Sequence, residues 1–138
     1  MSIQINYQLP FRLKDVTKVK LLLRTLTTAE GFSIDNLSIV FVSDEYLYEL
    51  NLKYLNHDYY TDIITFDYST KRSKAINGEL YISIDRAKDN AKKINVTVQA
   101  EVKRLIIHGL LHLCGYEDAN PQAKHAMTQK EDFYLKQM

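Results

Sequence analysis

Two histidines and an aspartate in the last third of the chain have the spacing of metal ligands. His108 and His112 are four residues apart, which on a helix puts both imidazoles on one face, about 40° apart around the axis. Gly115 can end that helix in a left-handed conformation, and the chain can then fold back and bring Asp118 toward the histidines. Nitrogen and carboxylate ligands suit zinc, and three protein ligands leave a fourth position open for water, as in catalytic zinc sites.

The residues around this motif favour a metal site over a chance histidine pair. Between 105 and 114 the chain is apolar except for His108, Gly109 and His112. The histidines could instead be two satisfied polar groups beneath an apolar helix, but burying imidazoles without partners costs free energy. The glycine and the carboxylate at matching offsets favour the metal. Cys114 is predicted to point away from it, into the core.

Gly109 argues against peptidase chemistry. In zinc peptidases with a helical histidine pair, a glutamate directly follows the first histidine and acts as the general base. Here that position holds Gly109. A bound metal would still activate water and polarise an oxygen, so hydrolysis remains the predicted chemistry.

Three segments resemble one known family. The run 108–118, HGLLHLCGYED, is similar to the HGxLHLxGYDH signature of the YbeY family, bacterial metal-dependent endoribonucleases that mature ribosomal RNA. The runs 50–66, LNLKYLNHDYYTDIITF, and 78–83, GELYIS, resemble two further blocks of that family. The order and spacing of three blocks make this resemblance more specific than a single motif.

The chain departs from the family pattern at two positions. The family's usual third histidine is Asp118 here, and its functional arginine falls on Leu55. Arg104 shares a helical stripe with Glu101 and His108, so it could replace that arginine as a catalytic residue. The alternative is that Arg104 and Glu101, three residues apart, simply pair with each other.

Length and composition are typical of one domain, predicted to span residues 1–138. A net charge of +1 means that nucleic-acid contacts must come from a local patch. One cysteine excludes a disulfide within the chain and favours a reducing compartment. No apolar run approaches the roughly 20 residues of a membrane span. We therefore expect a cytoplasmic protein.

Hydrophobic periodicity and cap residues predict the order β-α-β-α-β-β-α-α-α and an α+β fold. This order corresponds to a small mixed sheet with about five helices packed against it. The family resemblance implies a sheet of about four strands with the histidine helix beneath it, as in zincin-like enzymes. The predicted strands are 3–7, 37–42, 63–68 and 78–84, and the predicted helices are 15–29, 44–55, 85–93, 98–114 and 121–136. The second helix should bury Leu47, Leu50 and Tyr54, and the last should pack Phe133 and Leu135.

The segment 56–61, NHDYYT, lies between two of these elements and contains three ring side chains. His57 is either an exposed loop histidine or a substrate contact. Tyr59 and Tyr60 either pack within the protein or stack on unpaired bases, as aromatic side chains do in single-strand binders.

We therefore predict a metal-dependent endoribonuclease specific for single strands. Ligands His108, His112 and Asp118 would hold one divalent ion, Zn²⁺ by preference, and water on that ion would hydrolyse the phosphodiester. The RNA target, ribosomal RNA or ribosomal subunits, rests on the resemblance. A zinc peptidase-like hydrolase and a non-catalytic, metal-stapled ribosome assembly factor are the alternatives.

Overall fold

The computed structural model describes residues 2–70 and 72–137, which form five helices and one four-stranded sheet. The elements are β1 (Ser2–Tyr7), α1 (Val16–Ala29), β2 (Ser33–Val42), α2 (Asp44–Leu55), β3 (Ile63–Asp67), β4 (Ala75–Ser83), α3 (Ile84–Ile94), α4 (Val98–Leu113) and α5 (Pro121–Leu135). The predicted element order and the α+β class are confirmed. No helix in the described part of the chain is long and apolar enough to cross a lipid bilayer.

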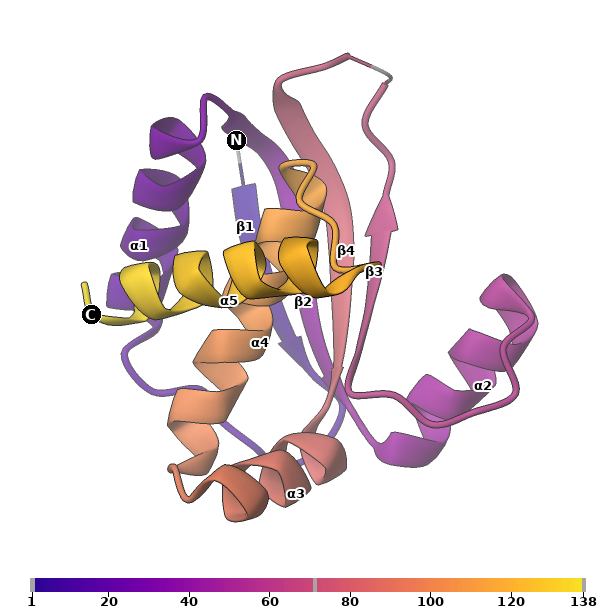
Figure 1. Cartoon of the computed structure of the whole chain (residues 1–138). Coiled ribbons are helices and arrows are strands. Elements are labelled where there is room, and N and C mark those ends of the chain that lie inside the picture. Colours follow the sequence, from indigo (N-terminus) through magenta and orange to yellow (C-terminus); the bar gives the residue numbers. More distant parts are fainter. Residues whose placement is uncertain (1, 71, 138) are drawn as a thin grey trace.

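The sheet is mixed, with the strand order β1-β2-β4-β3. β1 and β4 both pair in parallel with β2, and β3 pairs antiparallel with β4 at one edge. Figure 1 shows α4 lying across one face of the sheet, α5 crossing over α4, and α2 set apart beyond β3. The helix with the histidine pair therefore lies against the sheet, as the family resemblance implied.

Four of the five helices begin at a side-chain N-cap, and three of these caps, those of α2, α4 and α5, were read from the sequence. In each case a short polar side chain accepts a hydrogen bond from an otherwise unpaired backbone N–H. The caps are Ser43 for α2, Ser83 for α3, Thr97 for α4 and Asn120 for α5. Pro121 follows Asn120 at the first helical position, where it needs no backbone donor.

The core lies on both faces of β2, and this explains its continuous apolar run. Ile39 and Phe41 belong to the large cluster beneath α1 and α4, whereas Val40 and Val42 pack with Leu47 of α2 in a smaller cluster on the other side. Alternate residues of a strand point to opposite faces, so a strand covered on both sides needs apolar residues throughout.

Several predicted details are wrong because distant parts of the chain decide them. β2 starts at Ser33 and β4 at Ala75, both earlier than predicted, because these two residues pair with each other across the sheet. Tyr54 is 59% exposed, and the polar Asn51 is buried in its place. Phe133 is 56% exposed, whereas its neighbour Tyr134 is buried.

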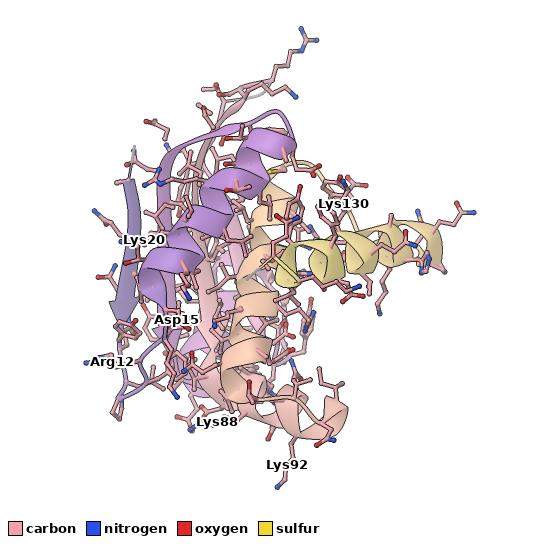
Figure 2. The ribbon with its side chains drawn as sticks, turned by 90° about the vertical axis from the view of Figure 1, so that its left-hand side faces the viewer. Arg12, Asp15, Lys20, Lys88, Lys92 and Lys130 are labelled. Atoms are coloured by element: carbon pink, nitrogen blue, oxygen red, sulfur yellow. The ribbon has the colours of Figure 1, made fainter. Side chains whose placement is uncertain are left out.

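Glu30, just after α1, joins three segments that are far apart in the sequence. Its carboxylate accepts hydrogen bonds from Tyr116 at 2.7 Å, Tyr134 at 2.5 Å and Lys130 at 3.2 Å. Figure 2 shows Lys130 on α5 near the end of α1 that carries Glu30. Burial alone would raise the pKa of Glu30, but the three donors together hold it below its ordinary value of 4.5.

This lowered pKa predicts a pH-dependent contribution to stability. The contribution is fully present above pH 4.5, the ordinary value, and is lost as the pH falls through the lower folded-state pKa. Glu30→Gln should reduce the free energy of unfolding by about 1–2 kcal/mol near neutral pH, because hydrogen bonds to a charged group are lost. Urea unfolding at several pH values should show the gap between variant and wild type closing in acid. Glu45→Gln, at an exposed position, is the matched control, and a pH-independent gap would contradict the assignment.

Candidate metal centre

The structure brings the three predicted ligands together at one point. The Nε2 atoms of His108 and His112 are 3.1 Å apart, and Oδ2 of Asp118 lies 3.6 Å and 3.5 Å from them. Donor atoms of all three residues lie within 4.8 Å of one another, so the group could hold a metal ion. The two histidines are partly buried and Asp118 is exposed.

The end of α4 produces this convergence by local geometry. The histidines lie one turn apart on α4, and Cys114 is the last half-helical residue. Gly115 then takes φ of 98°, a conformation that residues with a side chain rarely adopt. The N–H of Gly115 donates to the carbonyl of His112 at 3.0 Å and that of Tyr116 donates to Leu111 at 3.0 Å. These bonds reverse the chain and bring Asp118 back to the histidines.

A hydrogen bond at Nδ1 fixes the orientation of each imidazole. Nδ1 of His112 lies 2.9 Å from the backbone carbonyl of Tyr116, and Nδ1 of His108 lies 2.6 Å from Oε2 of Glu131. A carbonyl and an ionised carboxylate only accept hydrogen bonds, so both Nδ1 atoms carry the proton and donate. Both Nε2 atoms therefore present lone pairs to the centre.

The donor set fits a cation. Two imidazole lone pairs 3.1 Å apart and a nearby carboxylate oxygen repel one another unless positive charge lies between them. Nitrogen and oxygen donors in this number suit zinc, and three protein ligands leave one position of a tetrahedral site open. The role of these residues as ligands stays a prediction, and the chemistry of the donor set supports it.

Arg104 neutralises two buried carboxylates next to the centre. It donates from Nε and one terminal nitrogen to Glu101 at 2.7 Å and 2.6 Å, and from the other terminal nitrogen to Glu131 at 3.1 Å. Glu101 is 1% exposed and Glu131 4%. These contacts, the hydrogen bonds to Glu101 first, raise the pKa of Arg104 although burial opposes this. Arg104 thereby gives both buried carboxylates a charge partner between α4 and α5.

Two roles were predicted for Arg104, a catalytic role and a pairing with Glu101, and these contacts distinguish them in part. Its pairing with Glu101 is present, and it is not among the described residues that line the cleft beside the histidines. Its reach to Glu131, which in turn holds His108, supports a positioning role through that carboxylate. A catalytic role for Arg104 stays a prediction.

An open cleft of about 610 Å³ leads to the three residues. Its walls come from the end of α2, the loop after it, β3 and the second half of α4. The described lining residues are Asn51, Leu55, His57, Tyr59, Thr61, Asp62, Ile63, Ile64, Thr65, Asp67, His108, His112, Leu113 and Asp118. They include no lysine or arginine, and Leu55 stands where the family resemblance implied a functional arginine.

The three ring side chains of the loop before β3 take different positions. His57 and Tyr59 line the cleft and stack on each other, with ring centroids 5.1 Å apart. Tyr60 stacks on Tyr48, at 4.6 Å, and carries the guanidinium of Arg86 over its ring. Tyr59 is therefore placed where it can contact a base in the cleft. Tyr60 is 48% exposed and packs against Tyr48 and Arg86 at the surface.

Gly109 packs against the sheet. A Cβ at this position would lie 2.8 Å from Cδ2 of Leu80 and 2.9 Å from Cδ1 of Ile63. A side chain at this position would therefore require the side chains of Leu80 and Ile63 to move. The glycine at the position of the peptidase base thus also allows α4 to pack closely against the sheet.

Cys114 is a core residue, as predicted. It is buried in the large hydrophobic cluster, and burial raises the pKa of its thiol to about 12. A thiol in this state is neither a good metal ligand nor a good nucleophile near neutral pH.

The comparison with known proteins identifies the family. A family model described as endoribonuclease YbeY matches residues 6–138. The chain belongs to the YbeY family. Family membership confirms the resemblance of the three sequence blocks and the prediction of a hydrolytic endoribonuclease.

Individual relatives match over nearly the whole chain. The YbeY endoribonuclease of Cytophaga hutchinsonii is 47% identical over 125 residues, which are 91% of this chain and 87% of that protein. That of Flavobacterium psychrophilum is 40% identical over 134 residues, 97% of this chain and 94% of the relative. The solution structure of TM1509 from Thermotoga maritima is similar in fold, with a TM-score of 0.67 at 25% identity, covering 98% of this chain and 87% of that one.

Sequence reasoning missed the two partners of the histidines. Glu131 follows His108 by 23 residues and lies on another helix, so no local spacing connects them. The partner of His112 is the backbone carbonyl of Tyr116, and any residue type supplies a carbonyl. A buried glutamate in the last helix becomes interpretable only when its neighbours in space are known.

The position of Asp118 predicts that it contributes to metal affinity. Asp118→Ala should weaken zinc binding by at least about tenfold, as losses at metal sites do, whereas Asp118→His should retain tight binding because imidazole is also a good zinc donor. Competition with a fluorescent chelator measures both. Glu117→Ala removes the neighbouring exposed carboxylate and should change nothing. Unchanged affinity in Asp118→Ala would remove Asp118 from the ligand set.

The hydrogen bond of Glu131 to His108 predicts that Glu131 also contributes to zinc affinity. Glu131→Gln keeps the shape but loses the charge that orients and polarises His108, and should weaken zinc binding by about 10–100-fold. Asp132→Asn, the exposed neighbour on α5, is the control. Chelator competition gives the affinity and circular dichroism confirms the fold. Wild-type affinity in a folded Glu131→Gln variant would contradict this role.

Proposed function

We propose that this endoribonuclease cleaves single-stranded RNA in a reaction that depends on a divalent ion, zinc by preference, held by His108, His112 and Asp118. One observation carries the proposal: two fixed imidazole lone pairs and a carboxylate converge in the lining of an open cleft. When bound there, a divalent ion would activate water and offset negative charge on the phosphate.

The residues of the chain would prepare and line the site. Glu131 and the carbonyl of Tyr116 hold the histidines with Nε2 toward the cleft. Asp62, Asp67 and Asp118 add carboxylates to the lining, and these groups repel phosphate unless a cation offsets them. We therefore expect RNA binding, as well as cleavage, to require the ion.

The form of the cleft supports a single strand as substrate. An unpaired nucleotide can leave the stack, enter a cleft and place its base against an aromatic ring, whereas a duplex keeps its bases stacked and its backbone stiff. Tyr59 is an exposed ring at the cleft wall. We propose ribosomal RNA or ribosomal subunits as the target on the basis of the family resemblance, with the cytoplasm as the place of action.

The two alternatives make different demands on the site. A peptidase of the helical-histidine type needs a glutamate at position 109, where this chain has a glycine packed against Leu80 and Ile63. A purely structural metal would have its fourth ligand supplied by protein, whereas this site opens to a cleft of about 610 Å³. Both observations favour the ribonuclease.

The test is cleavage of a labelled single-stranded RNA and of its duplex by the purified protein. Activity should be higher on the single strand, vanish with a chelator and return with zinc or another divalent ion. His112→Ala removes a ligand and no proposed RNA contact, so it should abolish cleavage. His125→Ala, an exposed histidine on α5, should cleave like the wild type.

The same assay distinguishes the alternatives. Cleavage that survives both chelation and His112→Ala would point to a contaminating nuclease. Peptidase activity without RNA cleavage would favour a zinc peptidase-like hydrolase. Zinc binding at full occupancy without either activity would favour the metal-stapled assembly factor.

A further inference from the structure

The departing oxygen of the cleaved phosphodiester needs a proton donor in the cleft. When a phosphodiester is hydrolysed, the departing ribose oxygen takes the electron pair of the broken P–O bond, and a proton supplied to it accelerates the step. The described lining contains no lysine or arginine. Nδ1 of His108 and of His112 is committed to an acceptor, and Nε2 of each faces the ion position.

His57 is the remaining imidazole in the cleft lining, and its place is fixed by the end of α2. Asn56 ends the helix with φ of 55°, and the backbone N–H of His57 donates to the carbonyl of Asn51 at 3.1 Å. The buried side chain of Asn51 donates to the carbonyl of Tyr59 at 2.9 Å. One residue of α2 therefore anchors the backbone on both sides of His57.

Tyr59 holds the ring of His57 by stacking and by a hydrogen bond at Nδ1. The rings stack with an interplanar angle of 18°, and the Tyr59 hydroxyl lies 2.9 Å from Nδ1 of His57. If the hydroxyl donates, the neutral imidazole carries its proton on Nε2. If the imidazole is charged, Nδ1 donates to the hydroxyl and Nε2 again carries a proton. The hydroxyl can also accept from Nδ1 of the neutral ring, so the charged imidazole is the form that carries the Nε2 proton in every arrangement. Among the described residues Nε2 has no partner.

We propose that His57 is the general acid of this ribonuclease, an inference that rests on the proposed RNA cleavage. Water forms the new P–O bond and releases one proton to solvent. The bond from phosphorus to the ribose oxygen breaks, and that oxygen takes its electron pair together with the proton on Nε2 of His57. The imidazole then regains a proton from solvent. One water is consumed and His57 is unchanged.

The decisive experiment replaces the leaving oxygen with an atom that needs no proton. Three single-stranded oligonucleotides are compared: one unmodified, and two with sulfur in place of one or the other bridging oxygen at the cleaved bond. A thiolate leaves without protonation, so one of the sulfur substrates bypasses a general acid. Zinc-loaded wild type, His57→Ala, His57→Gln and the control His125→Ala are assayed on all three.

His57→Ala should lower kcat on the unmodified RNA by about 100- to 10,000-fold with KM little changed. His57→Gln, which donates a hydrogen bond but does not transfer a proton, should be equally slow. On one sulfur substrate both variants should come within about tenfold of wild type. Because the side chain of His57 is exposed, zinc affinity by chelator competition and the circular dichroism spectrum should match the wild type.

Each contrary outcome has a definite meaning. A His57→Ala variant with wild-type kcat would make His57 an exposed loop residue. An equal loss on all three substrates would assign His57 to substrate positioning or to proton removal from water, and would overturn the general-acid role. Loss of zinc affinity or fold in His57→Ala would make the role structural. If the wild type cleaves none of the RNAs, the proposed function fails and not this inference alone.

Discussion

The hydrogen bond between His108 and Glu131 joins the metal centre to the packing of the helices. It connects α4 to α5, and it requires an ionised carboxylate that is only 4% exposed. Such a charge is stable inside a protein only with a partner, and Arg104 supplies one for Glu131 and for Glu101 at the same time. The same contacts therefore hold α5 against α4 and orient a metal ligand.

The cleft lies between two unequal hydrophobic clusters that share the sheet. The large cluster holds α4 and its histidines, and the small cluster holds α2, which ends at the loop with His57. β3 and β4 contribute to both sides. Because few apolar residues hold α2, the hydrogen bonds of Asn51 to the backbone of His57 and Tyr59 become important for the position of the cleft wall. The position of His57 thus depends on Asn51, a buried polar residue outside the ligand set.

The sequence by itself determined the features that local rules control. The histidine pair, Gly115 and Asp118 lie within eleven consecutive residues, so helix periodicity and one left-handed residue are enough to bring them together. Helix starts followed from short polar caps such as Ser43, Thr97 and Asn120. The fold class and the four strands followed from the element order, and the place of the histidine helix beneath the sheet came from the family resemblance.

Only the tertiary structure decided what depends on distant neighbours. Glu131 and Arg104 became partners through the crossing of α5 over α4, and Gly109 acquired its packing role through contact with the sheet. The buried faces of α2 and α5 were wrongly predicted at Tyr54 and Phe133 because these helices have weak amphipathic periodicity. Their orientation is set by hydrogen bonds of buried polar residues, and a partner far away in the sequence leaves no periodic signal.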